Sequence, residues 1–376
     1  MTVVVVALQE SAPGERRVAI TPETAKKLRG LGATVRLGRG AGDRAYFPDA
    51  AYPEVEFVDD ATALASADVL LCVQPPPRER LAALKEGALV IGLLAPHGDD
   101  ERVKLLRDRR LSAFSMELLP RTTRAQAMDV LSSQAGMAGY KAVLIAAQQA
   151  PRFFPMLTTA AGTIRPSRVL VIGAGVAGLQ AIATARRLGA QVEGFDVRPE
   201  TREQIESLGA KFLDLGVSAA GEGGYARELT AEERAEQQRR LGEHLKNVDV
   251  IVTTAAVPGR PAPKIVTAAM VAGMKPGSVI VDLAAETGGN CELTRPGETV
   301  EHGGVAVVGP LNLASLGALH ASEMYARNLF NFLALMLGDG ALSVDFDDDL
   351  VAGTCLTHAG VIRHAPTRQR IEGGAA

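Results

Sequence analysis

The chain has 376 residues, 47% of them hydrophobic, and this length is typical of two domains with separate cores. Its 40 basic and 43 acidic side chains give a net charge of −3 without a basic block or tail, which argues against a nucleic-acid partner. The three cysteines are widely spaced, which predicts neither a disulfide framework nor a metal site. The sequence shows no apolar stretch long enough to span a membrane and no basic leader, so we expect a cytoplasmic protein.

The first 118 residues alternate short apolar runs with helical patterns, which is typical of a doubly wound α/β sheet. The predicted strands are 3–8, 34–37, 55–58, 69–73, 89–94 and 111–114, and the predicted helices are 22–31, 61–65, 78–84 and 99–109. This segment lacks phosphate-binding glycines. A long helical pattern over residues 123–148 then leads out of it.

A glycine turn with the sequence Gly-Ala-Gly-Val-Ala-Gly occupies residues 173–178. It lies between a predicted buried strand, 168–172, and a predicted helix, 176–188, and the next predicted strand, 191–196, ends in Asp196. Strand, turn, helix, strand and terminal carboxylate together form the dinucleotide-binding fingerprint in its full context. The sequence therefore predicts a bound dinucleotide. The alternative is a glycine turn that serves only the packing of helix against strand.

Each part of this fingerprint has a physical role. Gly173 permits a tight turn, Gly175 lets the backbone approach a pyrophosphate, and Gly178 lets the helix pack closely on the strand. The free N–H groups and the dipole of the helix N-terminus attract phosphate. Asp196 can accept hydrogen bonds from both adenine-ribose hydroxyls and would repel a 2′-phosphate, so NAD is favoured over NADP. Arg198 weakens that preference slightly, because a guanidinium can pair with phosphate.

The rest of the chain completes a second domain and returns to the first. Further strands are predicted at 211–215, 249–253, 278–283 and 305–308, followed by a long helix at 315–337. We therefore expect an α/β protein with two doubly wound Rossmann-like domains, joined by two long helices, with a cleft between them. The expected domains are residues 1–125 plus 330–376, without the glycine fingerprint, and residues 126–329, with it.

Two further segments are candidates for function. The glycine-rich stretch 216–227, which contains Gly224 and Tyr225, follows a predicted strand and is interpreted either as a hinged lid or as a solvated loop. Arg121, Gln126 and Asp129 lie at the entry to the first long helix, where they could hold a nicotinamide carboxamide and its ribose. Spacing alone favours the simpler interpretation, a helix start with a capping acid and solvated charges.

Six segments of the chain resemble the NAD(H)-binding domain of proton-translocating nicotinamide nucleotide transhydrogenases, which is homologous to alanine dehydrogenase. The segments are residues 13–22, 121–140, 173–178, 195–199, 281–290 and 324–329. The resemblance covers nearly the whole chain. Because only one dinucleotide fingerprint is present, it points to the split form, in which this domain is a separate alpha subunit.

The resemblance also assigns roles to individual residues. It implies that Arg121, Gln126 and Asp129 contact the nicotinamide end of the cofactor and act in hydride transfer, with Ser132 close by. It implies a mobile loop that closes over NAD through Tyr225, beside Gly224. The remaining implied cofactor contacts are Gly173, Gly175, Val176, Gly178, Asp196, Val197 and Arg198.

The implied activity is hydride transfer between NADH bound to this chain and NADP(H) bound to a partner beta subunit. The transfer runs directly between two nicotinamide rings, so it needs alignment, close approach and exclusion of water but no acid–base group. The implied partners are a second copy of the chain, in a homodimer, and membrane-spanning subunits that carry out proton translocation. The expected location is the inner face of the cytoplasmic membrane, reached through those partners.

Two other functions remain open, alanine dehydrogenase and an NAD-sensing module. Alanine dehydrogenases use an arginine, a lysine and a histidine of the first domain to bind a keto acid and move protons. Arg17 corresponds to the arginine, but no lysine lies between Lys27 and Lys85, and the relevant strand end reads Cys-Val-Gln-Pro at residues 72–75. The histidine position falls on Leu94, or on His97 if the alignment shifts.

Overall fold

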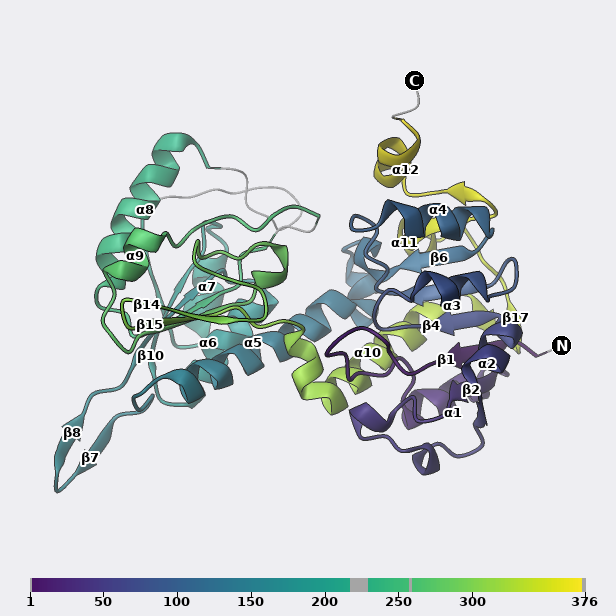
Figure 1. Ribbon diagram of the computed structural model, residues 1–376, viewed down its shortest axis with the longest axis horizontal. Coiled ribbons are helices and arrows are strands. Elements are labelled where there is room, and N and C mark those ends of the chain that lie inside the picture. The colour runs from purple at the N-terminus through teal and green to yellow at the C-terminus, as the bar shows by residue number, and fades with distance from the viewer. Residues whose placement is uncertain (1, 217–228, 257–258, 374–376) are drawn as a thin grey trace. The chain divides into compact units, whose positions relative to one another are not determined.

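The computed structural model describes residues 2–216, 229–256 and 259–373, which form two compact units (Figure 1). The first unit comprises residues 1–134 and 315–376, and the second comprises residues 135–314. The division therefore lies near residues 134 and 315 rather than at the expected 125/126 and 329/330. The difference arises because helix α10 (Ala318–Leu333) packs on elements of the first unit.

The first unit is a Rossmann-like α/β domain built on an eight-stranded sheet with the order β19-β18-β6-β5-β4-β1-β2-β3. Strands β1 to β6 are parallel, while β18 pairs antiparallel with β6 and with β19. The return of the last residues to this sheet agrees with the sequence analysis. The elements are β1 (Val4–Ala7), α1 (Pro22–Gly30), β2 (Thr34–Gly38), η1 (Asp43–Ala45), η2 (Asp49–Ala51), β3 (Glu56–Val58), α2 (Asp60–Ser66), β4 (Val69–Leu71), α3 (Arg78–Ala82), β5 (Leu89–Gly92), α4 (Asp100–Asp108), β6 (Ser112–Ser115), η3 (Met116–Leu118), η4 (Thr123–Met128), α10, β16 (Leu337–Gly338), β17 (Ala341–Leu342), α11 (Asp349–Thr354), β18 (Cys355–His358), β19 (Val361–Ile362) and α12 (Ala365–Glu372).

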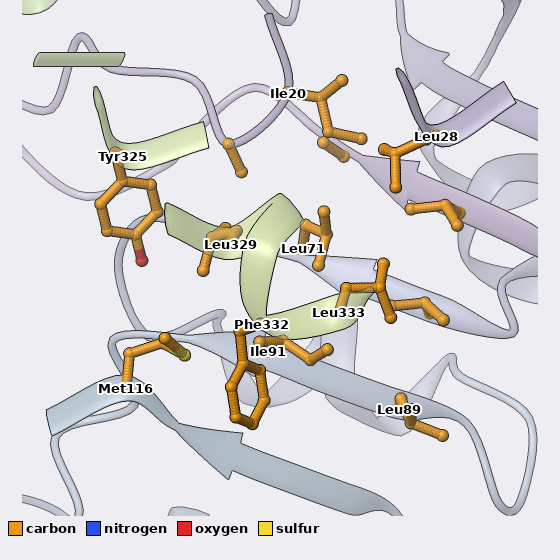
Figure 2. Packing of buried hydrophobic residues seen from close by; sticks show 14 of the residues in the cluster. Ile20, Leu28, Leu71, Leu89, Ile91, Met116, Tyr325, Leu329, Phe332 and Leu333 are labelled. Atoms are coloured by element: carbon orange, nitrogen blue, oxygen red, sulfur yellow. The ribbon is translucent and has the colours of Figure 1, made fainter. Parts of the chain in front are cut away.

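Helix α10 supplies much of the core of the first unit. Figure 2 shows Leu329, Phe332 and Leu333 of this helix lying over Leu71 and Ile91 of the central strands. These apolar side chains are fully or almost fully buried, and burial on this scale is the main force that holds helix and sheet together.

The hydroxyl of Tyr325 adds a polar connection to this core. It donates to the carbonyl of Cys72 at 2.9 Å and accepts from the N–H of Leu93 at 3.1 Å. The ring is fully buried, so these bonds also satisfy a hydroxyl that would otherwise be costly to bury. Tyr325 therefore connects the segments that follow β4 and β5.

The second unit is also a Rossmann-like α/β domain, with the strand order β11-β10-β9-β12-β13-β15-β14. Neighbouring strands of this sheet are parallel except β14, which pairs antiparallel with β15 at one edge, and β7 and β8 form a separate antiparallel pair. The elements are β7 (Leu157–Thr159), β8 (Gly162–Ile164), β9 (Arg168–Ile172), α6 (Val176–Arg187), β10 (Gln191–Phe195), α7 (Thr201–Ser207), β11 (Lys211–Phe212), α8 (Ala231–Leu245), β12 (Val250–Thr253), α9 (Ala268–Ala272), β13 (Val279–Asp282), η5 (Ala285–Thr287), β14 (Thr299–His302) and β15 (Val305–Val308). Helix α5 (Val130–Gln149) and the short helix η6 (Leu313–Gly317) contain the two boundaries between the units.

The two long helices predicted from the sequence are each interrupted or shortened. Residues 123–128 form the 3-10 helix η4, and α5 begins only at Val130. The break occurs because Asp129 adopts extended backbone angles, φ −74° and ψ 91°. The first residues of the second predicted helix, 315–337, belong to the 3-10 helix η6, and the α-helix α10 runs only from Ala318 to Leu333. The predicted strands of both sheets are confirmed, although several have shorter limits.

Candidate functional site

The glycine turn has the tight geometry that the fingerprint requires. Gly173 has φ +94°, and a Cβ at this position would lie 2.6 Å from Oγ1 of Thr254. A Cβ at Gly178 would lie only 1.8 Å from the carbonyl oxygen of Gly173. Packing within the chain therefore already requires glycine at these two positions.

Gly175 is different, because no packing contact with the described residues requires a glycine there. Its φ is −77°, and a Cβ would meet no atom within 4 Å. Gly175 is also the N-cap of α6, and in the part of the chain that the structure describes no side chain caps this helix. The next residue, Val176, is 46% exposed although it is apolar. The second glycine thus leaves open, uncapped backbone at a helix N-terminus, which is the arrangement that receives a phosphate group.

Asp196 lies directly beside this turn, at the end of β10. Its carboxylate accepts from the N–H of Ala174 at 2.7 Å and from Arg198 through the backbone N–H, Nε and Nη2 at 2.9, 2.9 and 2.7 Å. Burial alone would raise the pKa of Asp196, but the hydrogen bonds from Arg198 and Ala174 outweigh it, so the pKa is lowered. Asp196 is therefore ionised and paired with Arg198, a neighbour that the sequence analysis treated only as a possible phosphate partner. Val197, between them, is half-buried.

Two polar residues that the sequence analysis did not single out support the turn from neighbouring strand ends. Thr254, after β12, donates through Oγ1 to the carbonyl of Gly173 at 3.0 Å. The fully buried Asn290 donates to the carbonyl of Ala255 at 2.7 Å and accepts from its N–H at 3.0 Å. Asn290 ends the segment 281–290 of the family resemblance, whereas only a position after a strand end could have indicated Thr254.

The segment with Arg121, Gln126, Asp129 and Ser132 belongs to the first unit, whereas the glycine turn belongs to the second. Asp129 accepts from the N–H of Ser132 at 2.9 Å and from its hydroxyl at 2.6 Å, which is the geometry of an acid that caps α5. Gln126 lies in the 3-10 helix η4, and Asp129 is the extended residue that ends it. Arg121 and Gln126 are both exposed. The capping interpretation is thus correct for Asp129, and it leaves the other two side chains accessible.

The first unit also contains a buried polar cluster around Arg17, formed by Glu15, Arg17, Gln74 and Gln134. The Arg17 guanidinium donates to Glu15 at 2.8 and 2.7 Å and to Gln134 at 2.8 Å, and Gln74 Nε2 donates to Glu15 at 2.9 Å. Burial acts to raise the pKa of Glu15, but the bonds from Arg17 and Gln74 lower it to about 2. The amide of Gln74, from the strand end at residues 72–75, therefore bonds to the carboxylate that pairs with Arg17.

Neither candidate for the histidine of an alanine dehydrogenase joins this cluster in the contacts observed. Leu94 is buried, and His97 is exposed, with its ring 6.1 Å from that of His364. Glu10 is a further buried acid nearby, which accepts from the N–H groups of Val73 at 2.6 Å and Gln74 at 3.2 Å. Burial raises its pKa to about 7.

Some predictions fall outside what the structure tests. Gly224 and Tyr225 lie outside the described residues. Among the residues that are described, no group of three or more His, Cys, Asp or Glu side chains could hold a metal ion. Within the same residues, none of the helices has the length and apolar character needed to cross a bilayer.

Comparison with known proteins reveals close relatives. Two family descriptions match: "Alanine dehydrogenase/PNT, N-terminal domain" over residues 6–138 and "Alanine dehydrogenase/PNT, C-terminal domain" over residues 142–365. A protein of Rhodospirillum rubrum, named as the first part of an NAD(P) transhydrogenase subunit alpha, is 46% identical over 370 residues, which are 95% of this chain and 96% of that protein.

Solved structures agree with these matches. The structure of a transhydrogenase from Sinorhizobium meliloti has a TM-score of 0.88 at 46% identity and covers 96% of this chain and 99% of its own. An L-alanine dehydrogenase structure has a TM-score of 0.81 at 24% identity, covering 99% and 100%. At that identity the second likeness supports the fold alone.

Proposed function

Because the chain belongs to the alanine dehydrogenase/PNT family, we propose that it is the NAD(H)-binding alpha subunit of a proton-translocating transhydrogenase. The amide of Gln74 is the observation that favours a transhydrogenase over an alanine dehydrogenase. It is half-buried and bonds to Glu15, the carboxylate paired with Arg17, and an amide cannot exchange the protons that imine and carbinolamine chemistry requires. Direct hydride transfer between two nicotinamide rings needs no such group.

We propose that the glycine turn of the second unit receives the dinucleotide. The open backbone at Gly175 and Val176 would accept the pyrophosphate at the N-terminus of α6, between the glycines at 173 and 178. Asp196 would accept hydrogen bonds from the adenine ribose, with Val197 and Arg198 beside it. Gly224 and Tyr225, which lie outside the described residues, are proposed to close over the cofactor.

For the hydride step, we propose that the accessible side chains of Arg121 and Gln126 hold the nicotinamide end, together with Asp129 and Ser132. Asp129 already orients Ser132 by two hydrogen bonds, so this end of the segment is pre-organised. All four residues would align the ring and exclude water, and none would act as an acid or a base.

The acceptor of the hydride is proposed to be NADP⁺ on a partner beta subunit, with proton translocation carried out by membrane-spanning partners. The chain has a single glycine fingerprint, so a second nucleotide has to come from another polypeptide. We place the complex at the inner face of the cytoplasmic membrane, as expected for the split form of the enzyme.

We also propose that the chain forms a homodimer, and a hairpin of the second unit supports this. Strands β7 and β8 form a two-stranded ribbon that extends away from the sheet of its unit (Figure 1), and all six of their residues are exposed. Met156 is 65% exposed, Leu157 37% and Ile164 44%. An isolated two-stranded ribbon is marginally stable, so a second copy is the proposed cover for these apolar side chains.

The dimer can be tested by light scattering of the purified chain. A variant with Met156→Glu and Ile164→Glu should give a monomer, while Val361→Glu, at an exposed apolar position of the first unit, should leave the dimer intact. A dimer that survives the hairpin substitutions would contradict the proposed interface.

One set of assays separates the three functions. The purified chain is tested for NADH binding, for NADH-dependent reduction of pyruvate with ammonia, and for transhydrogenation after mixing with the membrane subunits. We expect NADH binding and activity only in the mixture. Reduction of pyruvate by the chain alone would instead show an alanine dehydrogenase. Binding without activity in either assay would show a sensor.

A further inference from the structure

A cavity of about 310 Å³ lies in the second unit at the amino ends of its parallel strands. Arg168 begins β9, Lys211 begins β11, and Glu193 lies in β10 between them. The glycine turn follows the carboxyl end of β9, so four steps of extended chain, about 13 Å, separate the two ends of that strand. The cavity is therefore distinct from the dinucleotide turn.

The lining of this cavity is strongly basic. Arg168, Arg186 and Lys211 contribute three positive charges, and among the described residues none of their side chains forms an ion pair within 4 Å of a carboxylate. The one acid of the lining, Glu193, is hydrogen-bonded by Nε2 of His244 at 2.7 Å. This bond, together with the charges of Arg168 and Lys211, lowers the pKa of Glu193 despite its partial burial.

Helix dipoles explain only part of this charge. Arg186 lies in the last turn of α6 and His244 in the last turn of α8, where positive side chains complement the carbonyl ends of helices. Arg168 and Lys211 begin strands, so that explanation does not apply to them.

The position of Arg186 is itself set by the backbone. Gly209 has φ +76°, and a Cβ there would lie 2.8 Å from Nη2 and 3.3 Å from Cζ of Arg186. The guanidinium therefore lies directly against this glycine, in space that a larger residue would occupy. Arg186 is an exposed residue, so its guanidinium at this wall is accessible to an anion from solvent.

We propose that this cavity binds a small anion that carries two linked phosphate groups. Guanidinium groups bind phosphate oxygens in pairs, an ammonium adds a point charge, and a volume of about 300 Å³ is at the lower end of ligand-binding pockets. Such an anion is either free pyrophosphate or the diphosphate of a nucleotide, and the two sources share the same recognition chemistry.

The test measures binding by isothermal titration calorimetry at low salt, with the chain saturated with NADH so that the glycine turn is blocked. The probes are inorganic pyrophosphate and ADP. We expect at least one of them to bind with a dissociation constant below about 1 mM, and the tighter probe identifies the source. A variant with Arg168→Gln and Lys211→Gln should bind at least about tenfold more weakly.

The control removes two positive charges elsewhere in the same unit, with Arg239→Gln and Lys246→Gln. Both residues are exposed and already paired with Glu236 and Glu243, and neither lines the cavity. This variant should bind the probe as the parent chain does. The proposal is overturned if neither probe binds, if NADH competes with the probe, or if the two double variants lose affinity equally.

Discussion

The pair formed by Asp196 and Arg198 leads to a prediction about the choice of cofactor. In the free chain, Asp196 accepts four hydrogen bonds, three of them from Arg198. The substitution Asp196→Asn keeps the size of the side chain but removes its charge and one acceptor oxygen. It should weaken NADH binding, because ribose hydroxyls would no longer donate to a carboxylate, and it should release the Arg198 guanidinium from its partner.

The size of the effect follows from these contacts. A hydrogen bond to a charged group contributes about 1.5–3 kcal/mol, so NADH affinity should fall roughly 10- to 150-fold. NADPH binding should improve, since a like charge disappears and a free guanidinium can pair with the 2′-phosphate. The ratio of the two affinities should therefore shift by about two orders of magnitude or more.

The assay is fluorescence titration of both reduced cofactors, with circular dichroism as a check that the variant is folded. A double variant, Asp196→Asn with Arg198→Gln, is the matched control. It should lose NADH affinity to a similar degree and gain less NADPH affinity, because it lacks the guanidinium that would pair with the 2′-phosphate. The reasoning is refuted if Asp196→Asn binds NADH as well as the parent chain, or if the double variant gains NADPH affinity equally.

Three further predictions follow from single positions. Gly175→Ala should change the free energy of unfolding by less than about 0.5 kcal/mol, because its Cβ meets no atom of the described residues, yet it should weaken NADH binding at least about tenfold. Gly178→Ala should lower the free energy of unfolding by about 1–3 kcal/mol, and equal losses for the two variants in urea unfolding would contradict this. Gln126→Asn should slow hydride transfer in the reconstituted complex far more than it weakens NADH binding, and equal losses would refute a positioning role. Burial raises the pKa of Glu10 from 4.5 to about 7, so the folded chain holds this proton more tightly than the unfolded chain does. Relative to the Glu10→Gln variant, the free energy of unfolding of the parent chain should therefore fall by up to about 3 kcal/mol as the pH rises from 4.5 through 7. This is refuted if the urea midpoints of the two proteins differ by the same amount at pH 5 and at pH 8.

Several features of this protein could be predicted from the sequence because they depend on residues close together in the chain. The glycine turn at 173–178 needs only a strand, a turn and a helix in succession, and the apolar runs of both sheets mark buried parallel strands. The return of the C-terminal residues to the first domain could also be expected, since two long helical patterns were interpreted as the connections between the domains. Family membership follows from motifs of the same local kind.

Local sequence patterns gave the wrong limits, or no prediction, for segments whose composition suits more than one secondary structure. Residues 123–148 are rich in helix formers, but the carboxylate of Asp129 bonds to Ser132 and starts α5 at Val130, so the preceding turn is a 3-10 helix. The hairpin of β7 and β8 was not predicted, because its short, exposed strands lack the alternation of a half-buried sheet.

Other features were decided only by the tertiary structure, because they join segments that are far apart in the chain. Arg17 meets Gln134 across 117 positions, and the ion pair with Glu15 and the amide of Gln74 complete a cluster that no single motif contains. The basic cavity brings together the starts of three parallel strands and the ends of two helices. The sequence determined which residues were available for such sites, whereas the order of the strands decided which of them meet, since parallel strands gather their amino ends at one edge of the sheet and their carboxyl ends at the other.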